Sequence, residues 1–378
     1  NLTDFTLVLT EEMSAVLSSV DGPLDADGLR SSIDGGGDVR FSADEAGTQR
    51  LAVDVRDWVT DNDPASGSLE VAVKVPTVWA STDTTIYLWW GAPGETQPAP
   101  GDPFGQYAAY DTATVYLSPD GGASGRASLD SDGTVFGASS TSGIVGNALE
   151  FNGFSDRVAV PEIGGTLNDF TVSALFSLAS VQSSNAANRS YVLDFRGFNG
   201  LNGTDSMGLF IDGDNTVDGF LHYGSTFSQF QWYAPYSLID QVILASLSRD
   251  GTALRLSING EPVTFVQHLG EPVRITAMAL TNDPWSVGQA AGYAGVGNNY
   301  AFKGLVDEIR LSTTVRSAAW IKAEHANLLD PESLLSAGSP TDFVAILEIS
   351  SGDGQIATVD TPVSTPPSVV VKGPNDNP

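Results

Sequence analysis

Apolar and polar residues alternate with a period of two through most of the chain, which is the pattern of half-buried β-strands. In the stretch 69–75, for example, Leu69, Val71, Val73 and Val75 fall on one face. The same alternation predicts further strands at 5–9, 38–41, 51–55, 85–90, 170–176, 191–195, 207–211, 219–223, 242–248, 254–259 and 305–311. An all-β fold follows, with strands of the antiparallel type.

Proline and glycine divide this pattern into parts. The stretch GAPGETQPAPGDPFG after Trp90 is too rich in both residues to continue a central strand. We therefore predict a β-sandwich domain at 1–97, a Pro/Gly linker at 98–106, a longer β-sandwich at 107–332 and a C-terminal extension at 333–378.

Helical periodicity is clear at one place, residues 318–329. Ser317 is a suitable N-cap for a helix there. The side chains that would form one stripe of this helix are Trp320, Ile321, Glu324, Leu328 and Leu329. We expect a single short helix that packs across the second sandwich.

The C-terminal extension contains one strand-like run, FVAILEIS at 343–350, ahead of a proline-rich tail. The run has no evident neighbour in sequence, so we expect it to dock on a neighbouring surface. Our hypothesis is that it supplies an edge strand to the first domain, within the chain or from the next subunit, and so builds a head-to-tail filament. The residues assigned to this assembly are Phe343, Val344, Ile346, Leu347 and Ile349.

The charge of the chain restricts its partners. Seventeen basic residues stand against 46 acidic ones, giving a formal net charge of −29. This argues against a nucleic acid or an anionic membrane as partner, and no run is long enough to insert into a bilayer. The absence of cysteine excludes disulfides, thiol catalysis and thiolate metal sites. Such acidity suits a surface bathed in salt, as in a marine or halophilic setting.

Asp307 is the most informative acidic residue. Alternation over the strand at 305–311 places it on the same face as Leu305, Ile309 and Leu311. A carboxylate on an apolar face needs hydrogen-bond donors, a cationic partner or a metal. Backbone N–H groups, an arginine and Ca²⁺ are all compatible with the sequence.

Enzymatic activity is not expected. Jelly-roll glucanases use paired carboxylates on an E-x-D-x-x-E-like strand, which is absent, and nothing ties Glu308 and Glu324 to one cleft. No GxSxG nucleophile elbow occurs. A further acidic group misses the EF-hand spacing, so we interpret it as a solvated loop; its members are Asp205, Asp212, Asp214 and Asp218.

Aromatic residues offer a possible platform for sugar binding. The candidates are Trp232 and Tyr233 in one aromatic-rich segment and Trp285 in a Gly-rich region. Exposed rings stack on sugar faces, whereas buried rings fill the core of a sandwich. Both roles are compatible with the sequence.

Two stretches resemble known families. Residues 2–95 are similar to the DUF2341 domain, a family of no assigned activity in secreted and surface proteins, through Asp27-Gly28, Asp38 to Phe41, Trp58, Val73 to Pro76 and Tyr87 to Gly91. Residues 107–332 resemble LamG-like, concanavalin A-like jelly rolls, through GNALEFNGFSDRVAVPE, FTVSALFSL, LSINGEPV and FKGLVDEIRLSTTVRSAAWIKAEHANLLDP.

The second resemblance implies a structural Ca²⁺. In that family the Asp of the VDEIRL strand binds the ion together with backbone carbonyls near the LEFNG strand. By position, the ligand is Asp307, and Asn152 and Gly153 lie nearby.

Taken together, these patterns predict a secreted bacterial protein, extracellular or on the cell surface, with a structural or adhesive role and no enzymatic activity. Self-association into a homopolymer is the expected partner interaction. The alternative is a lectin-like module that binds a polysaccharide in a calcium-dependent way.

Overall fold

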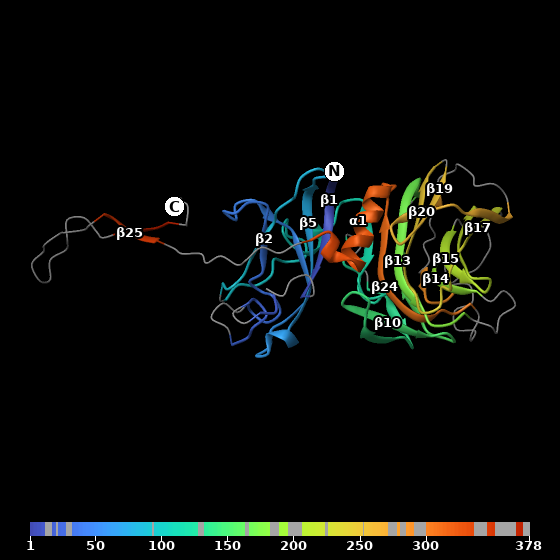
Figure 1. Ribbon diagram of the computed structural model, residues 1–378, viewed down its shortest axis with the longest axis horizontal. Coiled ribbons are helices and arrows are strands. Elements are labelled where there is room, and N and C mark those ends of the chain that lie inside the picture. The colour runs from blue at the N-terminus through green and yellow to red at the C-terminus, as the bar shows by residue number, and fades with distance from the viewer. Residues whose placement is uncertain are drawn as a thin grey trace, which may run out of the picture. The chain divides into compact units, whose positions relative to one another are not determined.

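The computed structural model contains two compact units, residues 1–336 and 337–378. The residues that the structure describes are 1–11, 17–19, 22–27, 32–92, 94–127, 132–162, 166–181, 189–195, 206–223, 226–251, 253–270, 278–279, 285–290, 300–335, 346–351 and 368–372. Nearly all of the regular structure is β, as the alternation predicts (Figure 1). Of the helices that the structure describes, none has the length and apolar character needed to cross a bilayer.

The first part of the larger unit is built from two three-stranded antiparallel sheets. Their strands, in spatial order, are β1 (Leu2–Thr10), β5 (Ser68–Val78) and β4 (Val53–Val59), then β3 (Arg50–Leu51), β2 (Arg40–Ser42) and β6 (Tyr87–Trp89). One apolar cluster, which includes Phe41, Val53, Trp58 and Val73, fills the space between them. The alternating face predicted for residues 69–75 is therefore a core face.

The second part is a sandwich of two eight-stranded sheets. The proximal sheet, named for its contact with the first domain, has the order β20 (Glu261–Val263), β19 (Leu254–Ile258), β18 (Val242–Asp250), β13 (Asp169–Leu178), β24 (Lys303–Ser312), β10 (Asn147–Asn152) and β9 (Ser139–Ser142), with β7 (Thr114–Ser118) also paired to β24. The distal sheet has the order β21 (Val266–Gly270), β17 (Thr226–Tyr233), β16 (Thr216–Tyr223), β15 (Ser206–Asp212), β14 (Ser190–Asp194), β23 (Trp285–Val287), β11 (Arg157–Val160) and β8 (Thr134–Phe136). A further pair is formed by β12 (Thr166–Leu167) and β22 (Met278–Ala279).

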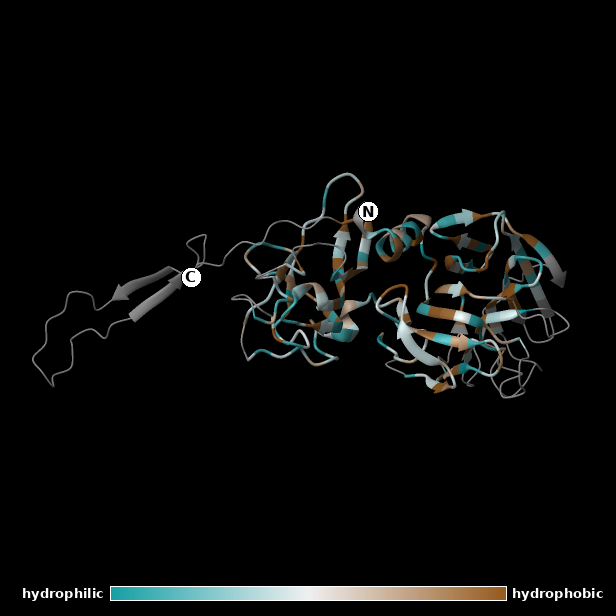
Figure 2. Cartoon of the chain, turned by 60° about the horizontal axis from the view of Figure 1, so that its bottom comes forward, coloured by the Kyte–Doolittle hydropathy of each residue, from teal (hydrophilic) through white to brown (hydrophobic). Residues whose placement is uncertain are grey.

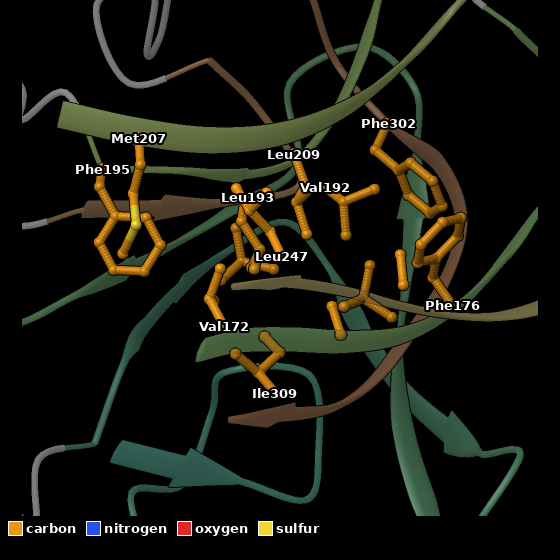
Figure 3. Close-up of a cluster of buried hydrophobic side chains, with 14 of the residues drawn as sticks. Val172, Phe176, Val192, Leu193, Phe195, Met207, Leu209, Leu247, Phe302 and Ile309 are labelled. Atoms are coloured by element: carbon orange, nitrogen blue, oxygen red, sulfur yellow. The ribbon is translucent and has the colours of Figure 1, made fainter. Parts of the chain in front are cut away.

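The main core lies between these two sheets. Val172 and Ile309 of the proximal sheet face Val192 and Leu209 of the distal sheet, and all four are buried (Figure 3). Hydrophobic and hydrophilic residues alternate along several strands of the sandwich (Figure 2). Period-two patterning thus places one side of each strand in the core.

Helix α1 (Ala318–Leu329) begins and ends where the periodicity predicts, with the Ser317 hydroxyl accepting the Trp320 N–H at 3.1 Å. It lies between β1 and β24 (Figure 1). Its apolar side chains belong to two hydrophobic clusters that contain residues of both domains. Leu328 packs with Val8 in the first cluster. Trp320 meets Phe5 edge-on at 5.1 Å in the second. The helix therefore fastens the two domains together.

The smaller unit contains β25 (Ile346–Ser351) and β26 (Ser368–Lys372), paired antiparallel. The expectation that this C-terminal strand lacks a neighbour in sequence is wrong, because Ser368–Lys372 pairs with it. Ile346, Leu347 and Ile349 lie in β25, whereas Phe343 and Val344 fall outside the described residues. We call this pair the C-terminal ribbon.

The edge of the first domain is also occupied. Val8 of β1 donates its N–H to Asn327 Oδ1 at 2.8 Å, and its carbonyl accepts from Asn327 Nδ2 at 2.7 Å. An amide side chain on α1 thus takes the backbone groups that an added strand would use at this point of the edge.

Candidate functional site

Asp307 is buried, as predicted, but it lies on the other face of its strand. Leu175 pairs with Asp307 and Ala174 with Ile309, so Glu308 is an extra residue in a β-bulge. The bulge reverses the alternation. Val306 and Ile309 therefore face the sandwich core, while Asp307 faces the first domain.

Backbone N–H groups surround the Asp307 carboxylate. Its Oδ2 accepts from Ile144 at 2.8 Å and from Val145 at 2.9 Å, and its Oδ1 accepts from Glu308 at 2.8 Å. Burial, and then the charge of Glu308, raise the pKa of Asp307 well above its usual range, against these hydrogen bonds. The carboxylate fixes the turn at residues 143–146, in which Gly143 donates to the Gly146 carbonyl.

The predicted calcium ligands are not brought together. Asn152 pairs with Lys303 of β24. Lys303 lies four residues before Asp307, so Asn152 and Asp307 are about 13 Å apart along the strand. The Asn152 side chain donates to Asp156 Oδ1 at 2.8 Å, and Gly153 follows it in a turn with φ of 77°. Within the described ranges, no three acidic or histidine side chains gather as a metal would require. A shell of N–H donors does not fit Ca²⁺, which takes six to eight oxygen ligands; the calcium site stays a prediction.

Next to Asp307 lies a buried ion network that the sequence did not predict. Arg56 of β4 donates through Nη1 to Glu308 at 2.5 Å and to Glu70 at 2.6 Å, and Glu308 also accepts from Arg310 at 2.9 Å. The side chains of Arg56 and Glu308 are 2% and 0% exposed. Burial alone would raise the pKa of Glu308, but the charges of Arg56 and Arg310 bring it below its usual value. These groups lock the first domain onto the jelly roll.

The three aromatic candidates have different environments. Trp285 is 2% exposed, stacks on Phe195 at 4.3 Å and meets Tyr116 edge-on at 5.1 Å. It is a core residue and is not placed to contact a sugar. Trp232 is half-buried against the core, whereas Tyr233 is 55% exposed.

Tyr233 is the last residue of β17 and leads into a largely exposed loop; we call residues 233–239 the tyrosine loop. Tyr236 within it is 43% exposed and meets Trp232 edge-on at 6.3 Å. Asn215, in the left-handed region at φ of 68°, holds the loop from the adjacent hairpin. Its Nδ2 donates to the Tyr236 carbonyl at 2.6 Å and its Oδ1 accepts from Leu238 at 2.9 Å. The two tyrosines are therefore presented on a fixed backbone.

A polar network lies behind this loop on the distal sheet. Asp218 accepts from Gln229 Nε2 at 2.9 Å and from the Thr216 hydroxyl, and Gln229 Oε1 accepts from Arg189 at 3.2 Å. Asp218 is 0% exposed, and burial raises its pKa to about 7 against those hydrogen bonds. Our interpretation of this acidic stretch as a solvated loop is wrong for Asp218, which lies on β16. Asp205 falls outside the described residues.

Sequence could have suggested this network. In TVDG and SQFQWY, polar residues recur at every second position, and β16 and β17 pair Asp218 with Gln231 and Thr216 with Tyr233. The Gly, Asp and Asn content of the hairpin concealed the alternation.

Comparison with known proteins gives a family match for part of the second domain. Residues 151–322 match the model of a family described as the concanavalin A-like lectin/glucanases superfamily. Among curated proteins, none matches the sequence of the chain.

Several solved structures are similar to the chain at low identity. Domain 4 of AbnA, a GH43 extracellular arabinanase from Geobacillus stearothermophilus, in complex with arabinotriose, is 16% identical with a TM-score of 0.41, and the match covers 56% of this chain and 97% of that one. The binding domain of botulinum neurotoxin serotype D is 11% identical with a TM-score of 0.41, over 58% of this chain and 52% of that one. A heptameric SAP-like pentraxin from Limulus polyphemus is 14% identical with a TM-score of 0.32, over 46% and 78%. The family match and the two packed sheets agree: this all-β chain contains a concanavalin A-like domain.

Proposed function

We propose that the chain is a non-enzymatic adhesion protein, secreted and extracellular, whose concanavalin A-like domain binds a neutral polysaccharide through the tyrosine loop. The observation that carries this proposal is the pair of exposed rings, Tyr233 and Tyr236, on a loop fixed by Asn215. Aromatic rings at the surface stack on the apolar faces of sugars, and a fixed loop loses little conformational entropy on binding. The resemblance of residues 2–95 to the DUF2341 domain of secreted and surface proteins supports the location.

The electrostatics around the loop select the class of glycan. Asp214 is exposed beside Asn215, which holds the loop, and Asp240 is exposed directly after the loop, whereas Asp212 is paired with Arg189 at 3.3 Å; the whole chain carries a net charge of −29. Uronic acid or sulfate groups would be repelled by this field. A neutral polymer is therefore the expected ligand.

The test is affinity electrophoresis of the full chain through a panel of neutral and anionic polysaccharides. We expect retardation by a neutral polymer, and about a tenfold loss of affinity, or about 1.4 kcal/mol, in each of Tyr233→Ala and Tyr236→Ala. Trp79→Ala is the matched control, because this ring is 52% exposed elsewhere on the surface. Binding that survives both tyrosine substitutions, or that is absent for every polymer, would refute the proposal.

We also propose self-association into a homopolymer through the C-terminal ribbon. A two-stranded sheet is marginally stable alone in water and leaves the backbone groups of both outer edges unpaired. The ribbon is such a sheet among the described residues of its unit. Sedimentation of the full chain should shift with concentration, and removal of residues 337–378 should abolish that shift; a truncated chain that assembles unchanged would contradict this proposal.

A further inference from the structure

Two of the described sheet edges of this protein are protected against pairing with another chain. Exposed edges invite pairing with other chains, and charged side chains, proline or covering elements normally prevent it. The edge strand β20 carries Glu261 and Pro262, and β1 is met by Asn327 of α1.

Other edges of the jelly roll lack such residues: β21 carries no charged side chain and no proline, and the same holds on the side of β8 and β9. Strands β8 and β9 are the edges of the distal and proximal sheets, and both lie within residues 133–149, which contain no charged side chain and no proline.

The distal edge is also apolar. All three residues of β8 are exposed, including Val135 at 37% and Phe136 at 40%. Phe154 is 56% exposed in the bend before β11, the strand that pairs with β8. The Arg157 guanidinium stacks on the Phe136 ring at 3.9 Å, and Asp156 is buried and bonded to Asn152. Among the described strands β8 pairs with β11 alone, so its outer edge presents apolar side chains beside backbone groups that another strand could pair with.

The charge of the chain indicates what can dock there. Two copies at −29 repel each other, so a contact is favoured where neither side carries excess charge. The C-terminal ribbon meets this condition, because its two strands carry one glutamate and one lysine. Its strands have six and five residues, long enough to span the three residues of β8.

We propose that β8 is the acceptor for the C-terminal ribbon of a second copy, which extends the distal sheet by two strands. This inference rests on the self-association proposed above and assigns its acceptor. Donor and acceptor are different surfaces, so the contact is head-to-tail and produces an open chain or a ring. It differs from docking on the first domain, whose edge strand β1 is engaged by α1.

Complementation between two defective chains tests the inference directly. Val135→Glu in the full chain places a carboxylate on the acceptor edge and leaves the ribbon intact. Residues 1–336, a compact unit with its own cores, keep the acceptor and lack the ribbon. Neither protein alone should self-associate, and a mixture should form a one-to-one complex that does not grow, measured by sedimentation velocity.

The matched control is Val266→Glu. Val266 is 50% exposed on β21, the opposite edge strand of the same sheet, and this variant should assemble like the parent chain. We expect Val135→Glu to weaken association by at least about tenfold, with circular dichroism and melting temperature unchanged from those of Val266→Glu.

Each other outcome is informative. If truncation abolishes assembly and Val135→Glu does not weaken it, the ribbon associates elsewhere and this inference is overturned. If the truncated chain still assembles and Val135→Glu prevents that, the edge pairs with itself and the ribbon is not the occupant. If truncation and Val135→Glu both leave assembly unchanged, self-association through the ribbon fails as well.

Discussion

Replacement of Arg56 by methionine should reveal how strongly the two domains are locked. The guanidinium makes charge-assisted hydrogen bonds to Glu308 at 2.5 Å and Glu70 at 2.6 Å in a site where its side chain is 2% exposed. Such bonds contribute about 1.5–3 kcal/mol each, and removal of one partner from a buried ion pair costs about 3–5 kcal/mol. Arg56→Met should therefore lower the free energy of unfolding by about 3–5 kcal/mol at neutral pH.

A surface pair of equal length provides the control. Lys322 and Glu261 also approach to 2.6 Å, but their side chains are 68% and 63% exposed. Lys322→Met should cost less than about 1 kcal/mol. Both variants are measured by urea unfolding with tryptophan fluorescence. Equal losses for the two, or a loss below about 1 kcal/mol for Arg56→Met, would refute the argument that burial of the network determines its strength.

Three further predictions concern single side chains. Asn327→Leu leaves the Val8 N–H and carbonyl without partners, so it should cost about 2–4 kcal/mol and speed hydrogen exchange at Val8; an unchanged exchange rate would count against the role of Asn327 at this edge. Because burial raises the pKa of Asp218 to about 7, its folded form holds a proton that the unfolded chain releases, so stability is present below the unfolded pKa and is lost as pH rises through about 7. Asparagine cannot ionise, so the stability of Asp218→Asn should fall by up to about 4 kcal/mol less than that of the parent chain between about pH 4 and pH 8. The free energy of unfolding of each protein is measured against pH; parallel curves for the two proteins would exclude the raised pKa of Asp218. Asp307→Ala removes the acceptor of three N–H groups and should lower the melting temperature. Because N–H donors surround this carboxylate, the parent chain should melt at the same temperature in Ca²⁺ and in EDTA. A melting temperature that rises with Ca²⁺ in the parent chain and not in Asp307→Ala would instead place calcium at this residue.

Local sequence patterns predicted most strands and the helix, but they did not predict features that depend on pairing with distant segments. The helix at 318–329 could be predicted because its period and its Ser317 cap are encoded within a few residues. The strand at 368–372 was missed because the surrounding prolines concealed it, although SVVVK has strong β propensity. The bulge at Glu308 depends on the register with β13, which alternation along one strand does not contain.

The same limit explains the candidate site. Alternation predicted a buried Asp307 but placed it on the wrong face, and its partners at 144 and 145 lie more than a hundred residues away in the sequence. Arg56 and Glu308 are separated by 252 positions. The sequence predicts that a buried carboxylate needs hydrogen-bond donors, but it does not predict which residues supply them. Trp285 illustrates the reverse case, since a tryptophan near glycine-rich sequence is equally compatible with a loop and with the core position it occupies.

Domain packing and sheet order together separate the two proposed activities in space. The second face of the proximal sheet is covered by the first domain and α1, through the clusters around Val8 and Phe5 and the ion network at Arg56. Ligands must therefore use the distal sheet or its loops. The tyrosine loop follows β17, near one edge of that sheet, and β8 forms the opposite edge, six strand spacings or about 29 Å away. A ribbon paired with β8 would therefore not itself occupy the tyrosine loop, and linked copies could bind one polysaccharide at several sites, which raises the overall affinity without any new contact.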